Sequence, residues 1–310
     1  MKKCWTLSHP PSRMKTLRKT PKIYATKAMI SYKTRSINNN ISTENILFFS
    51  NIKMALLDTV SRILAKHYPN PETELIYHTP FQLLLSVMLS AQTTDKQVNK
   101  VTQWFFDTIK TPQDLINRWE AAMTRAIASV NYAPTKARHL WSTAQMLIDP
   151  VFIDESHLSH KDALELRKTE QYSIPDRIEK LTLLPGVGIK TAKVVGAILY
   201  NLQVVAVDTH VHRVANRLWL CNTTQPNQTS NALEILLAKK ISSMKKNTTN
   251  HYHDFHHRII LFWRYQCKAQ NPQCQSCPLQ RQCQYFSLQR SSDESKKHLA
   301  FKKKKPIIRV

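Results

Sequence analysis

The amino-acid sequence predicts an all-α protein. Apolar residues recur at helical spacing from Met54 onward, and similar patterns return near 81–89 and 98–106. A period of 3.6 residues is typical of helices that bury one face. The first such run contains Leu56, Val60, Ile63 and Leu64. Strict alternation of apolar and polar residues, the pattern of a half-buried strand, is not convincing anywhere, and residues 204–207 are the one short candidate.

The length of 310 residues and an apolar content of 42% allow one large or two medium domains with real cores. The longest apolar stretches, 81–91 and 194–207, are interrupted by polar residues and are too short to cross a bilayer. We therefore expect a globular protein without a membrane-spanning helix.

The net charge of +24 favours a polyanionic partner, although much of it lies at the ends of the chain. Residues 1–53 hold 11 Lys and Arg residues and one acidic residue, and residues 288–310 hold 8 Lys and Arg residues and two acidic ones. Residues 54–287 keep a smaller basic excess of 26 against 18. This excess supports a nucleic-acid partner without proving one, because basic tails can also be simply solvated.

Residues 1–53 lack the apolar segment of a secretory signal. We interpret them as a basic, disordered extension, with a mitochondrial presequence as the alternative. In a bacterium the expected location is the cytoplasm, at the nucleoid. A targeting role for residues 1–53 would instead place the protein in a mitochondrion or nucleus.

All three glycines fall within eleven residues, at Gly186, Gly188 and Gly196. Pro185 precedes the first two and a helical pattern follows them, which predicts a tight hairpin that presents backbone N–H groups at a helix N-terminus. Such a place binds anions. The alternative is an ordinary capping turn between two packed helices. Gly196 lies two helical turns after Gly188, so we expect it to serve close packing.

Four of the six cysteines gather near the C-terminus with intervals of six, two and five residues. They are Cys267, Cys274, Cys277 and Cys283. Four thiolates in short loops predict a metal centre, either zinc or a 4Fe–4S cluster. A disulfide framework is less favoured because no secretory signal accompanies them. Cys221 is isolated and fits a small core residue.

The hairpin Leu184-Pro185-Gly186-Val187-Gly188, the motif Val207-Asp208-Thr209-His210-Val211 and the cysteine spacing occur in one order. Together they resemble the endonuclease III family of base-excision-repair DNA glycosylases, in the helix-hairpin-helix superfamily. The resemblance covers about Met54 to Phe286. It implies a 4Fe–4S cluster on the four cysteines and two helical domains that flank a DNA-binding cleft. The implied parts are a first helix of the cluster domain at 54–74, a six-helix barrel with the hairpin at 75–202 and the remaining cluster domain at 203–287. The segment 149–172, which we expect to be an insertion, and the basic tail at 288–310 lie outside the resemblance.

By this resemblance Lys190 and Asp208 are the catalytic residues. A lysine amine can attack the electron-poor anomeric carbon of a damaged nucleoside and form a Schiff base. A carboxylate can stabilise the positive charge that develops on the sugar. Taken without the resemblance, Lys190 is a solvated or phosphate-contacting lysine, and Asp208 caps the helix that begins at Thr209.

The resemblance also implies residues that contact DNA. Gln92, supported by Asp95, fills the space that the extruded base leaves, and Tyr132 is a second wedge. Backbone groups of Gly186, Val187 and Gly188 hold a phosphate. Lys268 and Arg281, in the cysteine segment, are expected phosphate contacts.

Two positions depart from the family pattern. Asn131 stands where glycine is usual, although asparagine is the next best residue for a left-handed backbone. Phe262 and Trp263 stand where the family has His-Gly, and the bulk of Trp263 is expected to disturb packing behind the cluster.

A group of four histidines, His251, His253, His256 and His257, has the composition of a metal site. The family has a histidine pair at the last two positions without a metal. We therefore interpret the four as polar residues on a helix surface and on the DNA side.

The function we expect is that of a monomeric, bifunctional DNA glycosylase and AP lyase, which removes oxidised pyrimidines from duplex DNA. An adenine-mismatch glycosylase is the nearest alternative, but it would carry a glutamate near Ser86 and lack Lys190. The second alternative is a non-catalytic iron–sulfur protein that binds DNA, which the presence of both Lys190 and Asp208 argues against.

Overall fold

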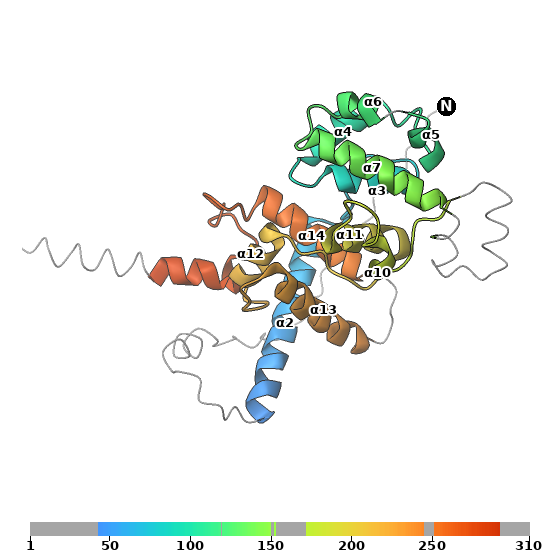
Figure 1. The fold of residues 1–310 in the computed structure, drawn as a ribbon. Helices are drawn as coiled ribbons and strands as arrows, with labels where there is room; N and C mark the ends of the chain where they lie inside the picture. The colour runs from blue at the N-terminus through green and yellow to red at the C-terminus, as the bar shows by residue number, and fades with distance from the viewer. Residues whose placement is uncertain (1–42, 119, 150–151, 153–171, 245–250, 292–310) are drawn as a thin grey trace, which may run out of the picture. The chain divides into compact units, whose positions relative to one another are not determined.

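Helices and turns form the regular structure of the residues that the computed structural model describes, which are 43–118, 120–149, 152, 172–244 and 251–291. No strand occurs in these ranges, so the all-α prediction is confirmed (Figure 1). The strand candidate at 204–207 has no partner strand and no regular structure. Residues 1–42, most of the expected insertion at 149–172 and the tail from 292 lie outside the described residues.

The helices are joined by connections of very different length. In chain order they are α2 (Thr43–His67), α3 (Pro80–Leu89), α4 (Asp95–Thr102), α5 (Pro112–Ile116), α6 (Glu120–Ala126), α7 (Ala133–Ile148), α10 (Ile178–Leu181), α11 (Ile189–Tyr200), α12 (Thr209–Arg217), α13 (Pro226–Ser242), α14 (His251–Tyr265) and the 3₁₀ helix η2 (Gln280–Gln282). Several begin where the sequence supplies a side-chain cap: Thr79, Thr94, Thr111 and Asp208 each accept a backbone N–H of the first turn. None of the described helices is long and apolar enough to cross a membrane.

The first helix differs from the range that we expected. It runs Thr43–His67 instead of 54–74. The expected start marked the first periodic apolar residues, but residues 43–53 contain neither proline nor glycine, so nothing in them stops the helix. Lys53 already contacts the rest of the chain, because its Nζ lies 5.9 Å above the ring of Trp219.

One hydrophobic core draws its residues from the segment between Leu75 and Val195. We call the helices around it, α3 to α11, the first helical group. α3 is its central element, and all of its residues after Pro80 are buried. A helix that is apolar on every side belongs inside a core. Gln82 and Ser86 are the buried polar residues of α3, and Gln82 donates its side-chain N–H groups to the carbonyl oxygens of Phe106 and Ile109.

A second core combines residues 57–64 of α2 with residues between Val205 and Cys283. We call α2, α12, α13 and α14 the second helical group. Cys221 is 2% exposed within this core, as the sequence predicted. Residues 48–310 form one unit, so both groups belong to the same body.

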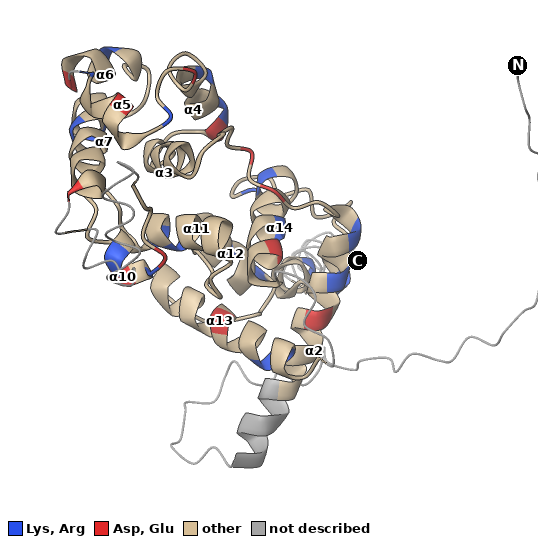
Figure 2. Cartoon of the chain, turned by 90° about the vertical axis from the view of Figure 1, so that its right-hand side faces the viewer, with Lys and Arg blue, Asp and Glu red and all other residues tan. Residues whose placement is uncertain are grey.

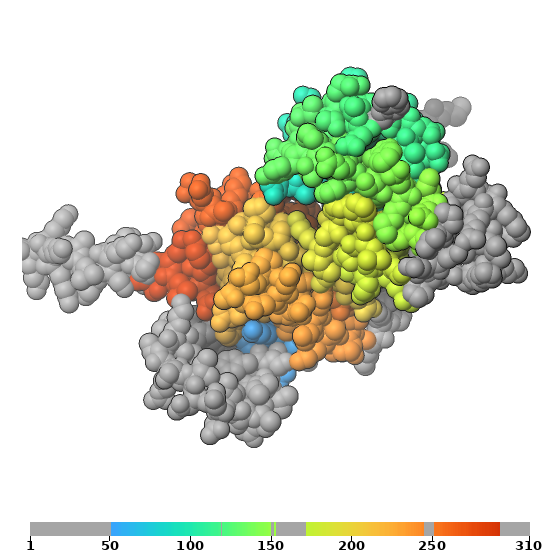
Figure 3. All heavy atoms as spheres, viewed as in Figure 1, coloured from blue at the N-terminus to red at the C-terminus, as the bar shows by residue number. Residues whose placement is uncertain are grey.

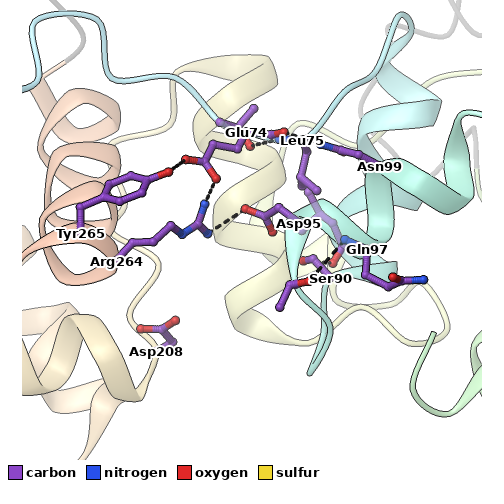
Figure 4. A network of polar contacts seen from close by, with 12 residues as sticks. Glu74, Leu75, Ser90, Asp95, Gln97, Asn99, Asp208, Arg264 and Tyr265 are labelled. Atoms are coloured by element: carbon purple, nitrogen blue, oxygen red, sulfur yellow. Dashed lines mark hydrogen bonds and ion pairs between the residues drawn. The ribbon is translucent and has the colours of Figure 1, made fainter. Parts of the chain in front are cut away.

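Polar contacts connect the two helical groups (Figure 4), which lie against one another in the space-filling view (Figure 3). The guanidinium of Arg264, on α14, donates to Asp95 Oδ2 at 2.8 Å and also pairs with Glu74. On α11, Lys193 Nζ lies 2.7 Å from a carboxylate oxygen of Glu234 on α13. All five charged groups are at most partly exposed, which reduces screening by solvent. These contacts fix the two helical groups relative to each other, and the candidate site lies between the two groups.

Candidate active site

A cleft of about 710 Å³ lies where the two helical groups meet. The first group supplies Gln92 and Lys190, and the second supplies Asp208, so three of the expected site residues line one cavity. Asp208 lies beside the Arg264 network in Figure 4. A cavity of this volume can enclose a ligand the size of a nucleoside.

Lys190 and Asp208 face each other in this cleft. Asp208 precedes α12, and its Oδ1 accepts the backbone N–H groups of His210 at 2.9 Å and Val211 at 2.8 Å. Its Oδ2 lies 3.4 Å from Lys190 Nζ. Asp208 therefore caps α12, which is the alternative that the sequence offered, and at the same time pairs with Lys190. The Lys190 side chain is 54% exposed, so the ion pair is weak enough for its amine to turn toward a ligand.

The turn before α11 requires glycine at Gly186. Its φ of +78° is a left-handed conformation, and a Cβ here would lie 2.6 Å from Nδ1 of His139. α7 holds the turn from behind, since Thr143 Oγ1 donates to the Pro185 carbonyl at 2.9 Å. The tight turn that the sequence predicted is therefore present, with positive φ at this glycine.

Gly188 and Val187 play different parts. Gly188 is the N-cap residue of α11 with a φ of −83°, and a Cβ added to it would meet nothing within 4 Å. The space beside it leaves the first N–H groups of α11 open to an anion. Val187 is buried, and its N–H donates to Leu184 O at 3.0 Å. Because this N–H is paired inside the protein, Val187 helps to shape the turn.

Gly196 serves packing, as predicted. A Cβ at this position would lie 2.6 Å from the Leu202 side chain and 3.2 Å from that of Ile178. A larger residue here would therefore require the Leu202 and Ile178 side chains to shift.

The two expected wedge residues, Gln92 and Tyr132, are exposed and share an unusual backbone. Gln92 has a φ of 57° and Tyr132 a φ of 60°, both left-handed. Asn131, which stands where the family has glycine, is not left-handed. Asn131 instead uses its side chain, whose Nδ2 donates to the Gln92 carbonyl at 2.5 Å.

The surface interpretation of the histidines is wrong for two of them. His256 is 2% exposed and His257 is 4% exposed, because α14 packs against α11, α12 and α13. Burial lowers the pKa of His257 to about 4 and that of His256 well below its ordinary value. Both imidazoles are therefore neutral near pH 7. Neither ring nitrogen of His256 has a hydrogen-bond partner among the described residues.

Trp263 lines the cleft and also packs against the second core, so its effect on packing behind the cysteines stays a prediction. Its ring stacks on that of His210, with centroids 4.0 Å apart and an angle of 13° between the planes. Burial lowers the pKa of His210, and the charges of Arg213 and Lys190 act in the same direction. The sequence alone did not reveal this stack, since its partners lie far apart in the chain.

The four expected metal ligands line a single small pocket with Leu218, Phe262 and Tyr285. They are Cys267, Cys274, Cys277 and Cys283, all free thiols. No three cysteine, histidine or acidic side chains among the described residues are placed to hold a single metal ion. Burial raises the pKa of Cys277 to about 11. An unliganded thiol here keeps its proton, and a bound metal would displace it.

Arg217 holds the cysteine segment in place, and sequence reasoning missed it. Its NH1 donates to Cys267 Sγ at 3.4 Å and to Lys268 O at 2.8 Å. Its guanidinium carbon lies 4.2 Å from the centre of the Tyr285 ring. Lys268 and Arg281 themselves are exposed, so their side chains are accessible to a phosphate.

Comparison with known proteins shows the family. The HhH-GPD superfamily of base excision DNA repair proteins matches residues 85–239. Endonuclease III of Rickettsia conorii is 35% identical over 232 residues, which cover 74% of this chain and 96% of that protein. Endonuclease III of Bacillus subtilis is 34% identical over 218 residues, covering 70% and 86%. The chain therefore belongs to the endonuclease III family within this superfamily.

Solved structures agree with this assignment. A trapped covalent intermediate of endonuclease III with DNA superposes with a TM-score of 0.62 at 32% identity, over 76% of this chain and 98% of that one. A non-covalent endonuclease III–DNA complex gives a TM-score of 0.63 at the same identity. A thermostable thymine-DNA glycosylase, 18% identical, shares the fold with a TM-score of 0.60.

Proposed function

We propose that this protein is a bifunctional DNA glycosylase and AP lyase, which removes oxidised pyrimidines from duplex DNA and cleaves the strand 3′ to the abasic site. The observation that carries the proposal is the pairing of Lys190 and Asp208, 3.4 Å apart in a cleft that can enclose a nucleoside. Family membership and the likeness to endonuclease III–DNA complexes support it.

Lys190 is the nucleophile in this proposal. Its uncharged amine attacks C1′ of the damaged nucleoside, a C1′–N bond forms, and the bond to the base breaks with its electron pair leaving on the base. Opening of the sugar ring then gives an imine between C1′ and Nζ. Loss of a proton from C2′ expels the 3′ phosphate by β-elimination.

Asp208 prepares and stabilises this reaction. Its Oδ2 is placed to take a proton from the Lys190 ammonium and to stabilise the cationic sugar as the base departs. The two N–H groups that hold Oδ1 fix the carboxylate before the substrate arrives. A group held in advance needs little reorganisation at the moment of reaction.

Gln92 and Tyr132 allow the damaged base to enter the cleft. Extrusion from the duplex costs a few kcal/mol of stacking and pairing. Two exposed side chains on left-handed backbone, one of them at the cleft, are suited to fill the space that the base leaves. Basic residues on both helical groups and the open N-terminus of α11 beside Gly188 suit the DNA backbone (Figure 2).

The four cysteines would hold a 4Fe–4S cluster. Four cysteine thiols that line one pocket are soft sulfur donors, which suit an iron–sulfur cluster. When bound, the cluster would fold the segment from Cys267 to Cys283 and so present Lys268 and Arg281 to the DNA backbone. Both catalytic side chains come from one chain, which supports action as a monomer.

The proposal is tested on a duplex that carries a single thymine glycol. The wild-type protein and a Lys100→Gln control should release the base and cut the strand, whereas Lys190→Gln should do neither. Lys100 is an exposed lysine of α4 outside the cleft lining, so its change removes the same charge at a neutral position. Release of adenine from a mismatch in place of thymine glycol would favour the alternative glycosylase. Binding without any product would favour the non-catalytic alternative.

A further inference from the structure

Lys136 is a buried lysine without an acidic partner among the described residues. It lies in the first turn of α7 and is 8% exposed. Its Nζ donates to Leu89 O at 2.7 Å, to Ala91 O at 2.6 Å and to Thr93 Oγ1 at 3.3 Å. Desolvation lowers its pKa, so the charged form is kept inside the protein only by these three neutral oxygens. Because burying a charge is costly, the contacts of Lys136 indicate what the lysine does in the structure.

The oxygens that Lys136 binds surround Gln92. Leu89 is the last residue of α3, where helix carbonyls lack intrahelical partners and favour a positive charge. Ala91 and Thr93 are the two neighbours of Gln92. Lys136 therefore holds the turn that keeps Gln92 in its left-handed conformation.

The same lysine also belongs to the turn that carries Tyr132. Its backbone N–H donates to the Tyr132 carbonyl at 2.9 Å, in the first turn of α7. A second link lies beside it, from Asn131 Nδ2 to Gln92 O at 2.5 Å. A third runs from Gln97 Nε2 to Ser129 Oγ at 2.7 Å. The two segments, about forty residues apart in sequence, are thus joined at several points.

We propose that Lys136 is a positioning residue, which holds Gln92 and Tyr132 as one rigid unit for insertion into DNA. The proposal rests on the proposed function, because it concerns how the base is extruded. Left-handed residues persist only where their surroundings hold them. A unit that is ordered before binding avoids the loss of side-chain and loop freedom on the DNA. Lys136 itself does not line the cleft and acts through the two wedge residues.

The test compares two substrates that differ in the need for extrusion. A duplex with thymine glycol requires it, whereas a single-stranded abasic oligonucleotide has no base to extrude. For Lys136→Met we expect single-turnover base release from the duplex to fall about 10-fold or more. The yield of borohydride-reduced adduct on the single strand should stay within about twofold of the wild type, because Lys190 and Asp208 are untouched. Lys100→Met is the matched control and should change neither.

A second variant guards against a folding defect in Lys136→Met. Asn131→Ala removes the neighbouring link from an exposed position, so the protein should keep its fold, and base release from the duplex should again fall more than adduct formation on the single strand. Fluorescence of 2-aminopurine beside the lesion should show slower extrusion for both variants. Equal losses on the two substrates, or full activity on the duplex, would overturn the positioning role. A wild-type protein inactive on both substrates would instead refute the proposed function.

Discussion

One carboxylate oxygen of Asp208 lies 3.4 Å from Lys190 Nζ, while its other oxygen caps α12. The two roles can be separated by substitution. Asp208→Asn keeps a good capping residue but removes the charge, so we expect base release to fall about 100-fold or more with little change in stability. Asp208→Ala should lose the cap as well and cost about 1 kcal/mol in the free energy of unfolding. Single-turnover kinetics and urea unfolding measure the two effects, and a fully active Asp208→Asn would contradict the catalytic role.

The two hairpin glycines should respond differently to alanine. Gly186→Ala forces a Cβ to 2.6 Å from Nδ1 of His139 at positive φ, which should destabilise the fold by roughly 1–3 kcal/mol. In Gly188→Ala the new Cβ meets open space, so the free energy of unfolding should be nearly unchanged. The affinity for DNA should fall, because the Cβ occupies space beside the N–H groups that we expect to hold a phosphate. Thermal unfolding and fluorescence anisotropy with an abasic duplex make the comparison. Equal stability of the two variants would show that the turn tolerates a side chain.

The Trp263–His210 stack should control the protonation of His210. Replacing Trp263 with glycine exposes the imidazole to water, and since burial is the largest cause of its lowered pKa, we expect the pKa to rise. Proton NMR titration of the His210 ring measures the change. An unchanged or lower pKa would mean that the stack does not shield this histidine.

Buried His257 should make the fold sensitive to acid. Its pKa is about 4 in the folded protein and near 6.5 in the unfolded chain, so the unfolded state binds more protons between these values. Stability should therefore be full above about pH 6.5 and decrease as the pH falls toward about 4, by on the order of 3 kcal/mol from this residue. Urea unfolding at a series of pH values should show a smaller decrease for His257→Gln. The same slope in both proteins would contradict the assignment.

Arg217 should stabilise the cysteine segment and whatever it binds. Arg217→Ala removes the donors to Cys267 Sγ and Lys268 O, so a bound cluster should be lost faster to a chelator. Decay of the visible iron–sulfur absorption measures this loss, and Arg62→Ala, on α2, serves as a control. A decay as slow as that of the wild type would show that Arg217 has no such role.

Local motifs predicted much of the candidate site. The cap at Asp208, the left-handed Gly186 and the tight packing of Gly196 each depend on a few neighbouring residues, and so they could be recognised in the sequence. The convergence of the four cysteines on one pocket followed from their spacing in the same way.

Long-range contacts could not be predicted in this way. The sequence around Lys136 is typical of a lysine on a helix surface. Only the fold brings its amine to carbonyl groups more than forty residues away in the chain. His256 and His257 lie on a buried face of α14. Because this face carries polar histidines, the apolar periodicity of the sequence does not indicate that it is buried. In this loop the left-handed residue is Tyr132 and not Asn131, and the asparagine side chain bonds across to Gln92, a contact between segments far apart in the chain.

The central claim is that Lys190 forms the covalent bond to DNA. Borohydride reduction of the protein on an abasic duplex, followed by proteolysis and mass spectrometry, tests it most directly. We predict one modified peptide that contains Lys190, and no adduct from Lys190→Gln. Attachment at another lysine, or an undiminished adduct from the variant, would contradict the account.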